Sequence, residues 1–385
     1  MGVRQGSVKK IIRLFADYQE IVVTIEGKEA KAIVYPEITG QVRANDLVWL
    51  NTTAVELKLG TGGYHFVMGI IDREKQEHRP KGHIMKLRYT PWQFPVMAVE
   101  EEGSPDHQKI LGFTSLEGTP VIVGTLHSMI VPALLAFHES RSQQRVVYIM
   151  TDGAALPISF SNVVRQLKKK GLLIQTITSG HAFGGDLEAV TIYSALAAAK
   201  MVAQADLIII TMGPGIVGTG TKYGFSGIEQ TYILEAVQKL GGYPIAIPRI
   251  SFADPRSRHC GLSHHSRTVL GELTYATAYI GLPYWDDERT QILASQIEES
   301  GLRRHHIYQV AIPAIDKLMA IYDLRIETMG RSYREDPTFF DTAAAAGVLA
   351  SLLRDTGEVN LPSWEGQGNQ LQHGLPQKQN IINNI

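Results

Sequence analysis

Cysteine is almost absent from this sequence, because Cys260 is the one cysteine in 385 residues. A single cysteine excludes a disulfide within the chain and a zinc site built from several thiolates. Such sparing use of cysteine is typical of proteins that work in a reducing compartment. We therefore expect a cytoplasmic protein.

An excess of one charge and long apolar runs are also lacking. The chain carries 37 Lys and Arg against 38 Asp and Glu, for a net charge of -1. A nearly neutral chain has no strong field for nucleic acid or an anionic membrane. No uninterrupted apolar run could span a bilayer, and residues 1–10 lack the apolar core of a signal peptide. We expect neither nucleic acid nor membrane as a partner, while a homo-oligomer remains compatible with the sequence.

The composition, 44% hydrophobic and 19% charged, is that of a globular protein. The N-terminal part contains five short runs rich in β-branched residues, at 8–15, 20–25, 30–35, 46–51 and 64–71. Short strands at this spacing predict a small β-barrel domain over residues 1–78. The polar stretch 72–82 predicts a domain boundary.

From residue 84 the pattern changes to alternating strands and helices. We expect strands at 121–124, 146–150, 173–178, 207–211, 244–250, 277–281, 306–311 and 324–327. Helices are expected from Ser128 and Ser226, and at 159–170, 187–204, 287–300, 313–321 and 337–353. This alternation predicts an α/β domain, residues 84–355, with a doubly wound, mostly parallel, Rossmann-like sheet. The Gln-, Asn- and Gly-rich residues 356–385 predict a polar C-terminal tail, disordered or peripheral.

The most informative stretch is 206–227, where a buried strand leads into a loop with six glycines and then a helix. Ser226 and Glu229 have the spacing of a capping box at the start of that helix. A strand, a glycine loop and a helix N-terminus together present free N–H groups to an anion. We expect an anion cradle made by Gly213, Gly215, Gly218 and Gly220, with Lys222 and Ser226 as further ligand-binding residues.

Two known fingerprints fit this loop poorly. Residues 213–218 match G-x-G-x-x-G, but the helix begins too late for a dinucleotide fold, which disfavours nicotinamide binding. A P-loop is excluded because Thr221, rather than lysine, follows Gly220. A purely structural role for the glycines remains the alternative to the anion cradle.

Ligands of an open parallel sheet bind at the carboxyl ends of its strands. The loops expected at that edge carry His127, Asp152 and His181, whereas the opposite loops hold ordinary turn residues. We expect these three side chains to carry acid–base or metal chemistry. Asp186, expected as the N-cap of the helix at 187–204, joins the ligand-binding set. The alternatives are a His181 bonded to a loop carbonyl and an Asp152 that caps its own turn.

The loop after the expected strand 244–250 is rich in histidine and arginine. His259, His264 and His265, with Asp254 and Cys260, could ligate a transition metal. Arg256, Arg258 and Arg267 suit bidentate binding of a phosphate or a carboxylate instead. We favour the anion, with Arg256 as a ligand-binding residue, and a divalent metal remains the alternative.

Four runs, at 50–57, 60–67, 180–190 and 212–227, resemble an uncharacterised family of Gram-positive bacteria, known as a domain of unknown function. The resemblance covers roughly residues 5–355. It implies a bacterial cytoplasmic protein, and it implies no activity, substrate or catalytic residue.

The sequence therefore predicts an enzyme, a transferase or a hydrolase, that acts on a small phosphorylated or carboxylated metabolite at the carboxyl edge of the sheet. No G-x-S-x-G elbow is present, so a serine hydrolase of that type is not expected. The alternative is a non-catalytic ligand sensor or interaction module.

Overall fold

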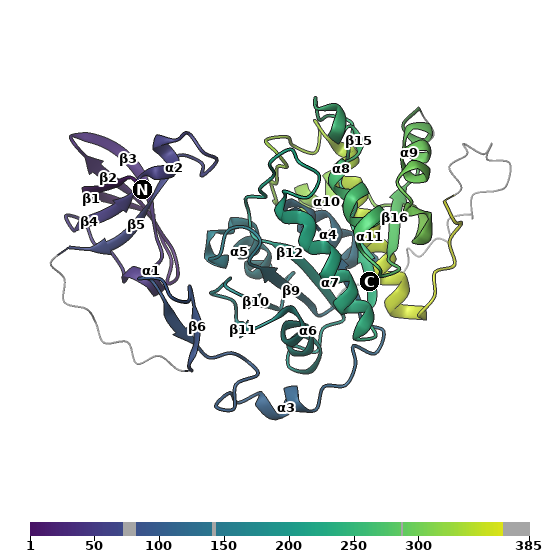
Figure 1. The fold of residues 1–385 in the computed structure, drawn as a ribbon, viewed down its shortest axis with the longest axis horizontal. Helices are drawn as coiled ribbons and strands as arrows, with labels where there is room; N and C mark the ends of the chain where they lie inside the picture. The colour runs from purple at the N-terminus through teal and green to yellow at the C-terminus, as the bar shows by residue number, and fades with distance from the viewer. Residues whose placement is uncertain (72–81, 141–143, 286–287, 365–385) are drawn as a thin grey trace, which may run out of the picture.

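The N-terminal part of the chain is a closed five-stranded barrel, which lies at the left of Figure 1. The computed structural model describes residues 1–71, 82–140, 144–285 and 288–364, so most of the predicted linker at 72–82 lies outside it. The strands close in the order β1-β2-β3-β5-β4 around an apolar interior that includes Ile21 and Leu50. Their bounds are β1 (Val3–Leu14), β2 (Gln19–Ile25), β3 (Lys28–Val34), β4 (Leu47–Asn51) and β5 (Tyr64–Ile70), with short helices α1 (Pro36–Thr39) and α2 (Thr53–Glu56). The predicted barrel is confirmed.

The second part is built on an eight-stranded sheet in the order β11-β10-β9-β12-β8-β13-β16-β17. Every neighbouring pair in this sheet is parallel. The strands are β8 (Pro120–Val123), β9 (Val146–Thr151), β10 (Gln175–Ser179), β11 (Leu187–Ala189), β12 (Leu207–Met212), β13 (Tyr243–Ala246), β16 (Tyr279–Pro283) and β17 (His306–Val310). The predicted α/β fold is therefore confirmed as well.

Helices cover both faces of this sheet (Figure 1). Along β12, Leu207 and Ile209 belong to one apolar core and Ile208 and Ile210 to the other, as the two-residue period of a strand requires. The first core contains residues of α4 (Ile130–Ser140), α5 (Asn162–Lys169), α10 (Ile315–Ile321) and α11 (Pro337–Thr356). The second contains residues of α6 (Ile192–Met201), α7 (Gln230–Lys239) and α9 (Glu288–Glu299). None of the helices that the structure describes is both long and apolar enough to cross a membrane.

A hairpin and α3 (His107–Leu111) connect the barrel to the large sheet. The hairpin pairs β6 (Ile84–Lys86) with β7 (Phe94–Val96). The buried Lys86 ammonium lies 3.0 Å from Glu188 and donates to the Gly180 carbonyl, which ties the hairpin to the β10–β11 side of the sheet. The barrel itself contacts α5, where the Arg165 guanidinium lies 4.3 Å from the centre of the Phe15 ring.

Several predicted boundaries are wrong. The helix expected at 187–204 begins at Ile192, because 187–189 form the strand β11. Asp186 does not cap it: its carboxylate accepts bonds from the Thr176 backbone and hydroxyl, while Thr191 caps the helix together with Ser194. The strand expected at 324–327 is absent from the described secondary structure, and the strand expected at 244–250 ends at Ala246.

The predicted capping box at Ser226 is also wrong. Residues Ser226–Glu229 form a 3-10 turn, η3, ahead of α7. The Ser226 hydroxyl accepts from the Val217 backbone instead, and Glu229 accepts from the Thr151 hydroxyl. Tertiary partners therefore take both side chains that the local pattern assigned to the helix start.

One residue of the predicted tail, Trp364, is packed into a core, whereas most of residues 356–363 are exposed. Trp364 is 4% exposed and belongs to the core between the sheet and α6, α7 and α9. Its backbone N–H donates to the Ile307 carbonyl, and Ser363 forms a bridge with Tyr308, which covers the edge of β17. The remaining tail residues, 365–385, lie outside the described chain.

The packing of α11 on α4 gives a test of the fold. A Cβ atom at Gly347 would lie 2.0 Å from the Ala133 carbonyl oxygen of α4. Gly→Ala in an exposed helix normally stabilises by about 1 kcal/mol. We expect Gly347→Ala instead to lower the free energy of unfolding by ~2 kcal/mol, because the helices must move apart. Urea unfolding followed by circular dichroism measures this, and a rise in stability would contradict the close approach of the two helices.

Candidate functional site

The candidate site lies at the carboxyl edge of the sheet, where its winding direction changes. β12 lies between β9 and β8, and β13 lies on the other side of β8. The loops that follow β8, β12 and β13 therefore leave three adjacent strands at one edge. His127 follows β8, Asp152 follows β9, His181 follows β10 and Gly215 follows β12. The loops that carry these four residues therefore all leave the sheet at the predicted edge.

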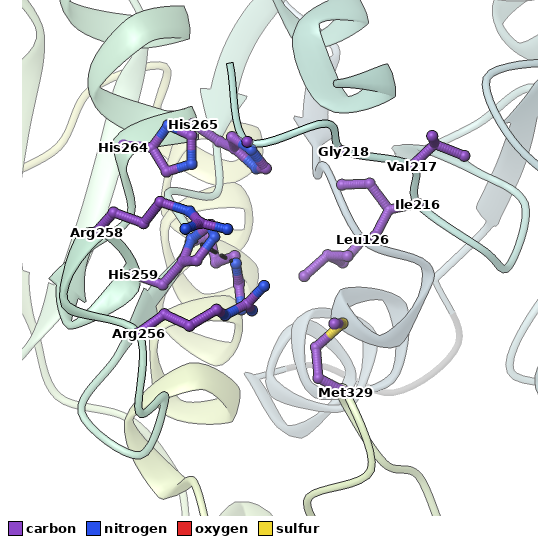
Figure 2. Close-up of a pocket in the computed structure, with 12 residues that line it drawn as sticks. Leu126, Ile216, Val217, Gly218, Arg256, Arg258, His259, His264, His265 and Met329 are labelled. Carbon is purple, nitrogen blue, oxygen red and sulfur yellow. Dashed lines mark hydrogen bonds between the residues drawn. The ribbon is translucent and has the colours of Figure 1, made fainter. Parts of the chain in front are cut away.

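A cavity of about 170 Å³, which we call the basic pocket, opens among these loops. Figure 2 shows arginine and histidine side chains on one side of it, with Leu126, Ile216, Val217 and Met329 on the other. Its polar lining consists of Arg249, Arg256, Arg258, His259, His264 and His265. Cationic groups thus face an apolar wall across the cavity.

A single buried carboxylate organises these cations. Asp254 is 4% exposed, and its Oδ2 atom lies 2.8 Å from the guanidinium nitrogens of both Arg249 and Arg256. Arg331, from a loop near the C-terminus, approaches the same oxygen at 3.7 Å and also pairs with Asp336 at 3.2 Å. The hydrogen bond from Arg256 is the largest cause that holds the pKa of Asp254 below its usual range. Asp254 therefore stays ionised and fixes the positions of the guanidiniums.

The three histidines are brought together as the metal alternative requires. One possible ligand atom from each of His259, His264 and His265 lies within 4.8 Å of the other two. The Nδ1 atom of His259 is already occupied, since Arg249 approaches it at 2.9 Å and the Ser263 hydroxyl at 2.8 Å. A guanidinium can only donate, so Nδ1 accepts and the proton of the neutral ring is on Nε2. His259 thus presents an N–H group, which suits an anion better than a metal ion.

Short local elements hold the other two histidines. Ser263 caps α8 (His264–Ser266), which runs directly into a π-helix, η5 (Arg267–Leu273). The His265 ring stacks on Phe225 with a centroid distance of 3.9 Å, and this contact joins the cluster to the end of the glycine loop. The Nε2 atom of His264 is buried without a hydrogen-bond partner in the described structure.

The histidines are neutral near pH 7, so the charge of the basic pocket comes from arginine. Burial is the largest cause that lowers the pKa of His259 to about 4 and that of His265 to about 3, and it lowers the pKa of His264 as well. Nearby guanidiniums lower these values further. Arg258 is exposed and forms no ion pair with any acidic residue that the structure describes. Its charge is available to a ligand.

The glycine loop is divided between two cavities. Gly218 and Gly220 line the basic pocket, while Gly213 and Gly215 line a second cavity of about 400 Å³. The loop tip is locked by its own bonds, since the backbone N–H of Thr219 donates to the Gly224 carbonyl and Gly218 bridges Phe225. Gly215 has a φ of +104°, a conformation that favours glycine.

Five of the predicted site residues lie outside both cavities. The exposed Lys222 pairs with Glu272. Asp152 accepts a 2.9 Å bond from the His181 backbone N–H, and the His181 ring lies 3.2 Å from the Arg88 guanidinium of the connecting segment. Asp186 binds Thr176 near the amino end of β10. Ser226 is bonded to Val217 within the glycine loop. The carboxyl edge therefore brings together only part of the predicted set.

His127 lines the second cavity, which shares Leu126, Ile216 and Met329 with the basic pocket. Sequence reasoning did not assign Arg249, Arg331 or Asp336 to the site, nor Ser161, which bonds to His127. One signal was present: Arg249 interrupts the apolar run 244–250, and a charged residue there needs a buried partner. The contacts of Arg331 with Asp254, of Asp336 with Ser251 and of Ser161 with His127 join distant segments and leave no local pattern.

Comparison with known proteins gives a family but no activity. The model of a family described as "Protein of unknown function (DUF3866)" matches residues 31–347 of this chain. No curated protein matches. The resemblance to a domain of unknown function is therefore confirmed.

The Asp254 network predicts a stability effect with a defined pH dependence. Asp254→Asn leaves the buried Arg249 without its anion, and we expect a loss of about 3 kcal/mol in the free energy of unfolding at pH 7. The folded-state pKa of Asp254 is below its ordinary value of 3.8, so its contribution is fully present above 3.8 and is lost progressively as pH falls from 3.8 toward the lower folded-state pKa. Urea unfolding of both chains from pH 7 down to roughly pH 3 should show the gap closing. A gap that is small at pH 7, or independent of pH, would contradict this role.

Proposed function

Because the chain belongs to this family of unknown function, we propose an activity from the site itself: an enzyme, a hydrolase or a transferase, that acts on a small phosphorylated or carboxylated substrate in the basic pocket. The observation that carries the proposal is the group of guanidiniums arranged around Asp254 beside three neutral histidines. The proposal takes the protein as cytoplasmic and bacterial, as the sequence resemblance implies.

The balance of charge favours an anion as the ligand. Three guanidiniums, those of Arg249, Arg256 and Arg331, pair with the carboxylates of Asp254 and Asp336. Arg258 lines the same pocket and pairs with neither carboxylate. Positive charge is therefore left over in a cavity that is partly closed by an apolar wall, where electrostatic attraction is stronger than in bulk water. Planar guanidiniums bind phosphate and carboxylate oxygens in a bidentate manner.

The histidines supply the chemistry that a binding pocket alone would lack. A neutral imidazole can accept a proton from an attacking group or, once protonated, donate one to a leaving group. His264 and His265 are free of carboxylate partners among the hydrogen bonds of the described residues, and both lie in the wall of the basic pocket. Converging ionisable side chains of this kind favour an enzyme over a sensor.

A metal-assisted form of the same chemistry is the second candidate. The spacing of the three histidines favours it, since one ligand atom of each lies within 4.8 Å of the others. For it to hold, Arg249 would have to release His259 Nδ1 and the ring would have to change its tautomer. Equilibrium dialysis against Zn²⁺ and Mn²⁺ distinguishes the two forms: stoichiometric binding that is lost in His264→Ala supports the metal form, and no binding supports the anion form.

Phosphate binding gives the direct test of the anion site. Arg258 forms no ion pair with an acidic residue in the described part of the chain and lies outside the Asp254 network, so Arg258→Ala removes a ligand contact without loosening that network. We expect its Kd for inorganic phosphate, measured by titration calorimetry at low salt, to rise about 10-fold. Lys222→Ala is the matched control, because it removes an exposed cation of the glycine loop that does not line the pocket. Its Kd should stay within a factor of about 2 of the native value.

The opposite ranking, with Lys222 essential and Arg258 neutral, would move the anion to the loop tip and contradict the proposal. The catalytic part is tested separately, by a turnover screen of phosphorylated and carboxylated metabolites. Binding without turnover for every anion that binds would favour the sensor. His264→Asn should then be measured on any substrate found, with loss of kcat and retention of phosphate binding as the expected result.

A further inference from the structure

A serine–histidine pair lines the second cavity. The Ser161 Oγ atom lies 2.6 Å from His127 Nε2, and both residues are buried against the cavity wall. On the other side of the ring, His127 Nδ1 lies 3.3 Å from the Met212 carbonyl oxygen and 3.2 Å from the Tyr148 hydroxyl. A carbonyl can only accept, so the ring proton is on Nδ1 and the Nε2 lone pair faces the serine hydroxyl.

We propose that Ser161 is a nucleophile, that His127 is its general base, and that the second cavity binds the acyl part of a carboxylic ester. A nucleophile within hydrogen-bond reach of a base, whose other side is held by a third group, is the arrangement that covalent catalysis requires. Here Met212 and Tyr148 hold the base, and Tyr148 is itself bonded to the Thr211 hydroxyl at 3.0 Å.

The reaction balances without a further co-reactant except water. The Ser161 oxygen forms a bond to the carbonyl carbon of the ester, and its proton passes to His127 Nε2. When the tetrahedral intermediate collapses, the bond to the leaving alcohol breaks and that alcohol takes the proton from His127. Water, deprotonated by the same nitrogen, then attacks the acyl-serine and releases the carboxylic acid, while Ser161 recovers its proton.

The start of α5 supplies the electrostatic part of such a site. Ser161 is the N-cap of this eight-residue helix, and its oxygen accepts a 3.0 Å bond from the Val164 backbone. The N–H groups of Asn162 and Val163, in the first turn, have no partner within the helix, and both residues line the cavity. Backbone donors at a helix N-terminus stabilise the negative charge that develops on the carbonyl oxygen.

Burial keeps His127 neutral. It lowers the pKa of His127 to about 4, so the ring is neutral and able to accept a proton at pH 7. The G-x-S-x-G motif places a serine on a turn directly after a strand. Ser161 lies between the 3-10 turn η2 (Ile158–Phe160) and α5 instead, so the absence of that motif does not bear on this pair.

The second cavity lies next to the basic pocket, and this position indicates a class of substrate. Its wall of Leu126, Ile216 and Met329 is also a wall of the basic pocket. An ester with an anionic group could place that group among the arginines and its acyl carbon beside Ser161. The anionic group of the ester rests on the proposed function, whereas the serine–histidine pair does not.

The test is covalent labelling of the native full-length chain with an uncharged alkyl fluorophosphonate. Ser161 should attack phosphorus with loss of fluoride, and intact-mass spectrometry should show one adduct that peptide mapping places on Ser161. Ser161→Ala and Ser161→Asn should both lose it; asparagine retains an N-cap, so the second variant separates reactivity from helix stability. His127→Gln should label at least ~100-fold more slowly.

Ser159→Ala is the matched control, because Ser159 belongs to the same segment and does not line either cavity. It should be labelled at the native rate. No adduct under conditions that label a reference serine esterase, an adduct on another residue, or an unchanged rate in His127→Gln would each overturn the proposal. The probe carries no anion, so a failure of phosphate binding would contradict the proposed function and leave this result intact.

Discussion

The site depends on one buried carboxylate that is shared among several guanidiniums. Asp254 holds Arg249 and Arg256 at 2.8 Å and draws Arg331 toward them from a distant part of the chain. Arg249 in turn donates to His259. By holding Arg249, Asp254 therefore determines the tautomer of His259 without a direct hydrogen bond to it. A buried ion group of this kind contributes little net stability, because desolvation offsets the attraction. Its value lies in position: it keeps the cations in fixed places and leaves part of their charge for a ligand.

Strand order determines which loops can share that ligand. β12 separates β8 from β9, and β13 lies beyond β8. The glycine loop therefore meets the arginine loop on one side and the segment after β9 on the other, where the Ala155 N–H donates to the Pro214 carbonyl. The stacking of Phe225 on His265 is the contact that joins the two loops. The loop after β10 instead contacts the hairpin that connects the barrel to the sheet, since Arg88 binds the His181 ring and Lys86 binds the Gly180 carbonyl.

Much of the fold could be predicted from the sequence, because buried strands and amphipathic helices leave local patterns. The five barrel strands and seven of the eight sheet strands were predicted near their observed positions, and Leu187–Ala189 was missed because three residues carry almost no period. Asp186 and Ser226 had the right residue type for caps, but tertiary partners took them. For the site, Gly218 and Arg256 line a cavity, and their role as ligand-binding residues stays a prediction. The roles of Arg331, Asp336 and Ser161 could not be found this way, because each also bonds to a distant residue, namely Asp254, Ser251 and His127 in turn. Strand order, which brings such residues together, is not visible in the sequence.

The two cavities share a wall. In both, burial rather than an acidic partner determines the protonation state of the histidines. In the basic pocket, buried neutral rings lie among guanidiniums, and the electrostatic repulsion that protonated rings would add is avoided. In the second cavity, the same desolvation keeps His127 neutral, and a carbonyl rather than a carboxylate fixes its tautomer. Adding a carboxylate beside either group would raise the pKa of its histidines and cancel positive charge. The fold places neutral imidazoles next to Arg258, which has no acidic partner among the described residues, while Asp254 and Asp336 are held in ion pairs with other arginines. It thus retains both a positive field for an anion and a base for a proton.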